Sequence, residues 1–148
     1  MVEPPPGLVL TDIERERIHN AIRNTCSASL MSDTKWRKLF TVLKTVPSVD
    51  HYFLKDIRGA KEMPGFNGFI LYAPHAFIDS FSFGPIYLRS IEWLEFPAHV
   101  PERINGSTPP GGHHQDLVGL RKALDAVGEF PLEDTARGLR VIGHVRAL

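Results

Sequence analysis

The sequence predicts an α+β fold, in which a single antiparallel sheet of four to five strands is covered by about three helices. Residues 66–97 hold nine of the fourteen aromatic residues, and aromatic and branched side chains favour strands. Two segments before this stretch and one after it have the three-and-four spacing of amphipathic helices. Short connections between the predicted strands favour antiparallel pairing, with the helices on one face.

The amino-terminal segment predicts a lead followed by a weakly amphipathic helix. Residues 1–10 include three consecutive prolines, so we expect a poorly ordered lead and a single domain over 11–148. Thr11 and Glu14 match a capping box, which predicts a helix over 12–24. Its apolar stripe is thin, so this helix either docks loosely or pairs with a partner, for example in a homodimer through residues 11–24.

A second helix and the strands follow. Ser32 or Asp33 can cap a helix that Pro47 stops, and its core-facing stripe is Trp36, Leu39, Phe40, Leu43 and Val46. Strands are predicted at 49–57, 69–72, 77–83 and 91–96, with a connection over 59–68 and a turn at Gly84-Pro85. In the last of these strands, alternation places Ile91, Trp93 and Glu95 on one face and Glu92, Leu94 and Phe96 on the other.

The last third predicts a loop, a helix and a final strand. Residues 98–112 are rich in Pro, Gly, Ser and Asn, which indicates a long loop of the kind that often carries function. A helix is predicted over 115–127, with Leu117, Leu120, Leu124 and Val127 buried. A strand over 139–145 completes the order: helix, helix, three or four strands, helix, strand.

Composition excludes several classes of protein. Lys plus Arg and Asp plus Glu each number 17 among 148 residues, so the clustered cations of a nucleic-acid surface are not expected. No apolar run approaches the roughly 20 residues that span a bilayer, and the start MVEPPPGLVL lacks the features of a signal peptide. The single cysteine, Cys26, allows no internal disulfide and fits a cytoplasmic location.

No motif specifies a reaction, and no cofactor is predicted. The histidines are scattered at positions 19, 51, 75, 99, 113, 114 and 144. Any of them could meet Asp56, Asp79 or Ser80 and act as a general base beside a nucleophile. One hypothesis is therefore a small cofactor-free hydrolase with a histidine and a carboxylate beside the 98–112 loop.

His113 and His114 are the nearest approach to a metal cluster. Adjacent histidines in an extended chain point to opposite sides, and no second cluster lies nearby in sequence to complete a tetrahedral set. The pair is more typical of a solvated loop end, so no metal site is predicted.

Acidic residues gather around the predicted aromatic sheet. Asp79, Glu92 and Glu95 have only Arg89 as a nearby cation in sequence, and Trp93 lies among them. An ordinary solvated strand face with one buried tryptophan explains this pattern. A functional interpretation is an acidic surface anchored by Trp93, which would bind a basic protein partner.

Four segments carry a resemblance: DTKWRKLF (33–40), SIEWLEFP (90–97), EDT (133–135) and GLRVIGH (138–144). They resemble a group of small uncharacterised bacterial proteins over about residues 31–146, with His144 standing where an aromatic residue is expected. The resemblance implies a single-domain immunity protein, which binds and blocks a cognate toxin. A ligand-sensing domain with an apolar cavity against the sheet is a further alternative.

Overall fold

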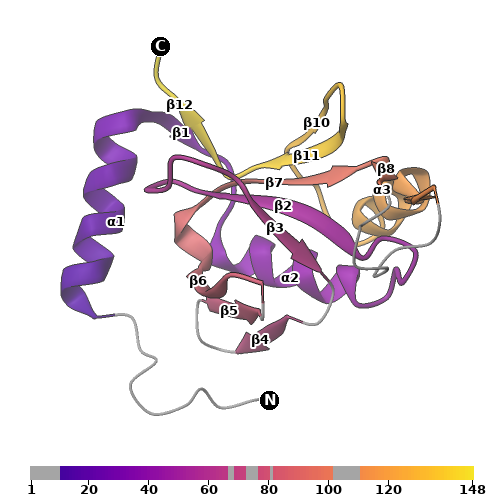
Figure 1. Ribbon diagram of the computed structural model, residues 1–148. Coiled ribbons are helices and arrows are strands. Elements are labelled where there is room, and N and C mark those ends of the chain that lie inside the picture. The colour runs from indigo at the N-terminus through magenta and orange to yellow at the C-terminus, as the bar shows by residue number, and fades with distance from the viewer. Residues whose placement is uncertain (1–10, 67–68, 73–76, 81, 102–110) are drawn as a thin grey trace.

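The computed structural model describes residues 11–66, 69–72, 77–80, 82–101 and 111–148. Within these ranges the fold is α+β, as predicted, with three α-helices and antiparallel strands (Figure 1). The largest sheet has five strands in the order β10-β11-β7-β2-β3. Its strands are β2 (His51–Asp56), β3 (Met63–Phe66), β7 (Ile91–Pro97), β10 (Leu132–Asp134) and β11 (Gly138–Ile142).

The prediction of a single sheet is wrong. A separate three-stranded sheet contains β4 (Ile70–Tyr72), β5 (Phe77–Ser80) and β6 (Gly84–Tyr87). Between β6 and β7 the chain forms a short 3₁₀ turn, η1 (Leu88–Ser90). The aromatic-rich stretch is divided at this turn: strands before it pair with one another, whereas β7 pairs with β2 and β11.

Two short ladders complete the strand pairing. β1 (Cys26–Ser29) pairs with β12 (His144–Arg146), and β8 (His99–Val100) pairs with β9 (His113–His114). The predicted connection over 59–68 contains β3, the predicted Gly84-Pro85 turn begins β6, and the predicted loop over 98–112 contains β8. A strand of two to four residues is too short to show an alternating pattern in the sequence. Such strands form because their cross-strand partners hold them in place.

The three helices begin where the sequence places a capping side chain. α1 (Asp12–Thr25) follows Thr11, whose hydroxyl accepts a hydrogen bond from the Glu14 amide at 3.1 Å. α2 (Asp33–Leu43) follows Ser32, which accepts from Lys35 in the same way. α3 (Leu117–Asp125) begins two residues later than predicted, because Asp116 is its cap. None of the helices in the described ranges has the length and apolarity needed to cross a membrane.

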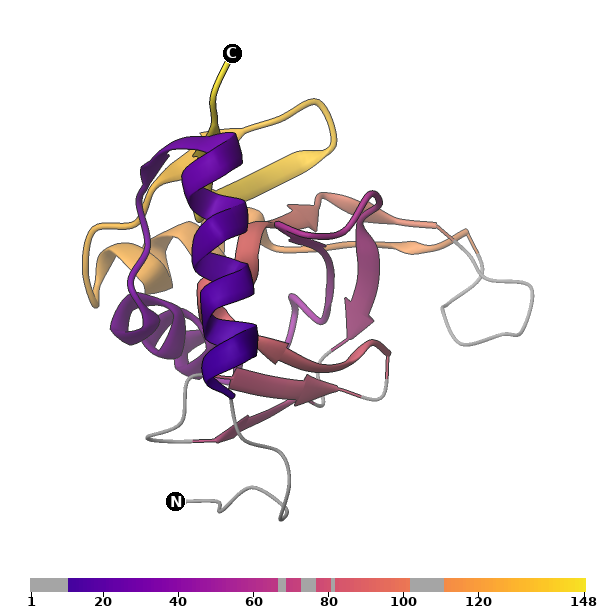
Figure 2. The same cartoon turned by 90° about the vertical axis from the view of Figure 1, so that its left-hand side faces the viewer.

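The main core lies between the five-stranded sheet and the helices α2 and α3, which lie on the same side of the molecule (Figure 2). Leu54, Leu94 and Val141 form one cross-strand row, and each is 0% exposed. The helices contribute the predicted stripes to the same core, namely Trp36, Leu39, Phe40, Leu43, Leu120 and Leu124. Val127, predicted to be buried, is instead 46% exposed because it lies beyond the end of α3.

α1 packs apart from this core, at the end of the sheet where β2 finishes (Figures 1 and 2). Ile18 and Ile22 are buried against Ile57 in a small cluster of their own, and Ile13 is 66% exposed. The helix therefore docks within one chain through a narrow contact. The homodimer through residues 11–24 stays a prediction.

A bulge alters the predicted alternation of β7. Trp93 pairs with Lys55, and Ile91 pairs with Asp56, which leaves Glu92 as an extra residue in β7. Ile91 consequently joins Leu94 and Phe96 in the core. The prediction that Ile91 shares a face with Trp93 and Glu95 is wrong for this reason.

Candidate functional site

The face of the five-stranded sheet opposite α2 and α3 is called the outer face below. Phe53, Glu95 and Arg140 are cross-strand neighbours on it, next to the pair Lys55 and Trp93. The guanidinium of Arg140 lies 4.0 Å from the Trp93 ring centroid, and a second cation, Arg137, lies 3.9 Å from that of Phe53. The outer face is thus built of aromatic rings with arginine planes over them.

Glu95 anchors both arginines. Its side chain is only 2% exposed and accepts hydrogen bonds from Arg137 Nε at 2.5 Å and Arg140 Nε at 3.1 Å. Arg137 also donates two parallel hydrogen bonds to Glu62, at 2.8 and 2.6 Å. These bonds lower the pKa of Glu62 and raise that of Arg137. A carboxylate this buried is stable only because two cations satisfy it.

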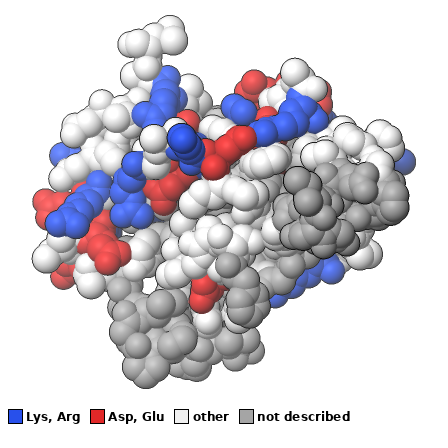
Figure 3. Space-filling view, viewed as in Figure 1, with Lys and Arg blue, Asp and Glu red and all other residues white. Residues whose placement is uncertain are grey.

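Glu92 forms a second ion-paired group further along the sheet. It accepts hydrogen bonds from Arg146 Nε at 2.9 Å and Lys55 Nζ at 3.4 Å. The bond to Glu92 raises the pKa of Arg146. Together the two groups form a band of alternating positive and negative side chains across the molecule (Figure 3). The carboxylates of Glu92 and Glu95 are therefore ion-paired with cations and do not form an open acidic surface.

The structure brings together only part of the predicted binding surface. Glu92, Trp93 and Glu95 lie on β7, whereas Asp79 lies on β5 in the three-stranded sheet, opposite Ile70 and Pro85. Arg89 lies in the turn between the two sheets, and its carbonyl oxygen is 2.7 Å from His144 Nε2. The cations beside Glu92 and Glu95 come from β2, β11, β12 and, for Arg137, the turn between β10 and β11. They are far from Glu92 and Glu95 in sequence, so proximity in sequence could not identify them.

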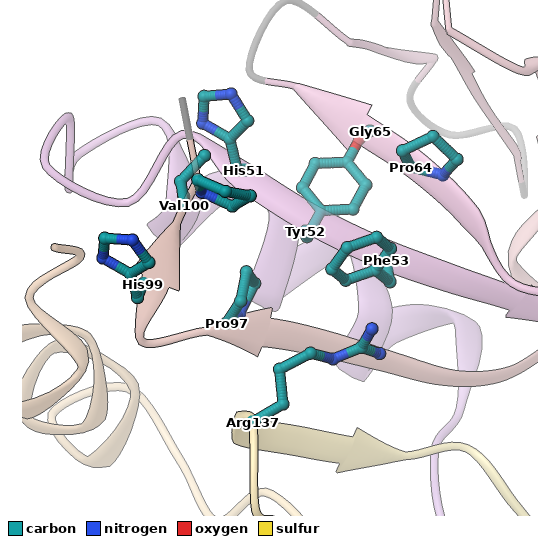
Figure 4. Close-up of a pocket in the computed structure, with 10 residues that line it drawn as sticks. His51, Tyr52, Phe53, Pro64, Gly65, Pro97, His99, Val100 and Arg137 are labelled. Carbon is teal, nitrogen blue, oxygen red and sulfur yellow. The ribbon is translucent and has the colours of Figure 1, made fainter. Parts of the chain in front are cut away.

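A pocket of about 260 Å³ opens at the β8 end of the outer face (Figure 4). It is lined by His51, Tyr52, Phe53, Pro64, Gly65, Pro97, His99, Val100, Pro101 and Arg137. The Tyr52 ring fills the space beside Gly65, where an added Cβ would lie 2.3 Å from a ring carbon. Burial raises the pKa of Tyr52, and its hydroxyl has no hydrogen-bond partner in the described part of the chain.

This pocket suits an apolar occupant better than an anion. Most of its lining is proline, valine and aromatic carbon, and the Arg137 guanidinium is already bonded to Glu62 and Glu95. Its volume of about 260 Å³ lies below the roughly 300–1,000 Å³ typical of small-molecule sites. The pocket is therefore best suited to a single side chain or another small apolar group.

Next to the pocket lies a cluster that sequence reasoning missed. Asp50 Oδ1 is 2.7 Å from His51 Nδ1 and 3.4 Å from His113 Nε2, and the three ligand atoms lie within 4.8 Å of one another. His51 is the first residue of β2 and Asp50 directly precedes it, whereas His113 reaches them from β9. An adjacent acid and histidine at a strand start was the available signal, but the β8–β9 pairing that delivers His113 has no sequence signature.

Gln115 fixes the two halves of this cluster relative to each other. Its side-chain oxygen accepts from the amides of Asp50 and His51, both at 2.9 Å, and its nitrogen donates to the carbonyls of His51 and Pro97, both at 2.9 Å. Gln115 is 6% exposed. A buried amide with these four bonds satisfied makes a rigid connection.

The other histidines occupy different settings. His114 packs its ring against His99 at a centroid distance of 4.9 Å. His144 is buried, with Nδ1 2.8 Å from Ser29 Oγ, and burial lowers its pKa. Asp56, predicted as a partner for a histidine, instead accepts from Ser90 and Arg58. His75 lies outside the described residues.

Comparison of the chain with protein-family models, with curated proteins and with solved structures gives no match. The resemblance to small bacterial proteins therefore stays a prediction. Function is inferred from the outer face, the pocket and the cluster of Asp50, His51 and His113.

Proposed function

We propose that the protein is a small binding domain that recognises a protein partner through the outer face, and that this partner is a cognate bacterial toxin, as for an immunity protein. The observation that carries the proposal is the stacking of Arg137 on Phe53 and of Arg140 on Trp93. Tryptophan, tyrosine and arginine dominate the energetic centres of protein interfaces. No helix in the described ranges lies over this face.

Ion pairing prepares these anchors for binding. Glu95 and Glu62 hold Arg137 in one orientation, and Glu95 holds Arg140. Side chains that are already ordered lose less conformational entropy when a partner binds. The pairing also changes the kind of partner from the one the sequence suggests. Because the carboxylates are neutralised, recognition depends on ring and guanidinium surfaces more than on attraction of a basic partner.

Affinity purification from the native cell tests this proposal. Wild-type, Trp93→Ala and Val118→Ala forms would be tagged and compared; Val118 is the control because it is 68% exposed on α3, away from the outer face. We expect one stoichiometric protein partner with wild type and with Val118→Ala, and its loss with Trp93→Ala. The partner is then tested as a toxin by growth with and without this chain.

Two results would contradict the proposal. One is the absence of any stoichiometric partner under all growth conditions. The other is equal recovery of the partner with Trp93→Ala and Val118→Ala, which would place the interface elsewhere. Circular dichroism of both variants shows whether a loss of binding reflects unfolding.

A second candidate function is hydrolysis at the Asp50 and His51 pair. The 2.7 Å contact between Asp50 Oδ1 and His51 Nδ1 orients the His51 imidazole, as a general base requires. His51 also lines the pocket. Water would be the nucleophile, since no hydroxyl is among the described partners of His51. Turnover of small ester or phosphoester substrates that is abolished by His51→Ala would favour this function.

A further inference from the structure

We propose that Asp50, His51 and His113 form a binding site for a divalent first-row transition metal such as Zn²⁺. This proposal does not depend on the proposed partner, because the cluster lies beside the pocket rather than on the ion-paired band of the outer face. The site consists of one carboxylate and two imidazoles contributed by two different strand segments.

The spacing of the three atoms suits a metal ion. Ligands about 2.0–2.2 Å from a tetrahedral Zn²⁺ lie roughly 3.3 Å from one another. The separation between Asp50 Oδ1 and His113 Nε2 is 3.4 Å, and that between Asp50 Oδ1 and His51 Nδ1 is 2.7 Å. A bound ion would replace the hydrogen bond between Asp50 and His51 and move these two atoms apart by a fraction of an ångström. The side chains are 45%, 12% and 26% exposed for Asp50, His51 and His113, so an ion can reach them.

The backbone around the cluster is already arranged for binding. Gln115 bonds to the amides of both Asp50 and His51 and follows directly after His113 and His114. Its own amide donates to Ala98 at 2.8 Å, which ties β9 to the segment after β7. The entropic cost of bringing His113 to Asp50 is therefore met by folding rather than by the ion.

The protonation of His113 is also compatible with metal binding. Its Nδ1 is buried and has no hydrogen-bond partner in the part of the chain that the structure describes. The Asp50 carboxylate, 3.4 Å from Nε2, can only accept a hydrogen bond, so Nε2 carries the proton of this contact in the metal-free chain. A bound ion would displace this proton, and Nε2 would then be the unprotonated ligand that a metal requires.

The ligand types select a class of ion. Imidazole and carboxylate together suit Zn²⁺, Co²⁺, Ni²⁺ and Fe²⁺, whereas Ca²⁺ and Mg²⁺ prefer sites built of oxygen. Three protein ligands leave at least one coordination position for water or a ligand. His51 belongs both to this site and to the apolar pocket, so a small ligand with a metal-binding group and an apolar tail is the class of molecule the pair would accept.

Titration calorimetry of the full chain with Zn²⁺ in a phosphate-free buffer tests the site. We expect one ion per chain, and a loss of affinity of about tenfold or more with Asp50→Asn and with His113→Ala. His114→Ala is the matched control, because His114 is the adjacent histidine but packs against His99. Zn²⁺ should also raise the melting temperature of wild type and His114→Ala, but not that of His113→Ala.

Three outcomes would overturn the proposal. These are no Zn²⁺ binding up to millimolar concentration, binding that His113→Ala and Asp50→Asn leave unchanged, and binding that His114→Ala removes equally. If His113→Ala does not fold, Asp50→Asn decides, because the half-exposed Asp50 side chain can be replaced by an amide of the same shape. A failure of this site would leave the proposed protein-binding function untouched, since that test depends on Trp93.

Discussion

Two neighbouring rows of the five-stranded sheet, one residue apart on β2, β7 and β11, use opposite chemistry. Leu54, Leu94 and Val141 form the inner row, and each is 0% exposed under the helices. Phe53, Glu95 and Arg140 form the outer row on the same three strands. Glu95 is nearly as buried as Leu94, with 1% of the whole residue exposed, although no helix in the described ranges covers it.

The comparison shows that burial on this sheet has two sources. In the inner row, apolar side chains are removed from water by packing against α2 and α3, which stabilises the fold without directional bonds. In the outer row, Arg137 and Arg140 cover Glu95 by bonding to it and lying over neighbouring rings. The first kind of burial tolerates apolar exchange, whereas the second requires that each charge keep its partner.

The largest effect is expected from the inner row. Leu94→Ala would remove a fully buried side chain and leave a cavity, at a cost of about 2–5 kcal/mol in the free energy of unfolding. Urea denaturation followed by circular dichroism measures this cost. Val118→Ala, at a site 68% exposed, should change the same quantity little. A loss at Leu94 no larger than at Val118 would contradict the core described above.

Glu95→Gln should be the next most damaging change. It preserves shape but removes the charge that satisfies Arg137 and Arg140, and we expect a loss of about 1.5–3 kcal/mol, the range for hydrogen bonds to charged groups. A double-mutant cycle with Arg140→Met should show coupling, since the two side chains are bonded at 3.1 Å. Strict additivity of the two changes would mean that the outer row does not act as a unit.

His144 is a buried polar residue whose ring nitrogens contact the Ser29 hydroxyl and the Arg89 carbonyl oxygen, neither of which is charged. Burial lowers its pKa below the usual 6.5, so the unfolded chain binds a proton at a higher pH than the folded one. Stability should therefore be complete above about pH 6.5 and decrease as the pH falls below that value. Glu62, whose pKa is lowered from 4.5 by its bonds to Arg137, affects stability only at lower pH.

Chemical denaturation at pH 7.5 and pH 5.5 measures this dependence. In His144→Gln, the decrease in stability between these two values should be smaller than in wild type. An unchanged decrease would mean that His144 does not cause the loss of stability at low pH.

The smallest effect is expected at the exposed ion pair of Arg121 and Asp134. Their side chains are 41% and 86% exposed and bonded at 2.8 Å. Asp134→Asn should change the free energy of unfolding by about 0–1 kcal/mol, because solvent screens an exposed pair. The same urea measurement used for Glu95→Gln gives a direct contrast between a covered and an exposed carboxylate. Equal losses in the free energy of unfolding for Asp134→Asn and Glu95→Gln would mean that burial of the Glu95 ion pairs does not increase their contribution to stability.

Sequence reasoning identified the long periodic elements correctly. The α2 stripe, the Thr11 and Ser32 caps, the strand at 91–96 and the α3 stripe through Leu120 and Leu124 all follow from local chemistry that one segment contains by itself. The division into two sheets, and the short strands β3, β6, β8 and β9, could not be read in this way. Their existence depends on a partner strand elsewhere in the chain.

The candidate sites show the same limit more strongly. Glu92, Trp93 and Glu95 were recognisable as a group because they are adjacent on β7. Their cations Lys55, Arg137, Arg140 and Arg146 were not, since strand order alone brings them there. The bulge at Glu92 further changed which residues share a face.

The sequence by itself determined the α+β class, the starts of α1 and α2 and most of the apolar stripes of α2 and α3, because capping and periodicity act over a few neighbouring residues. Only the tertiary structure decided that Glu92 and Glu95 are neutralised and that Asp50, His51 and His113 converge. Electrostatic pairing and metal-ligand geometry depend on distances in space. Those distances are set by which strands pair, and the pairing is a property of the whole chain.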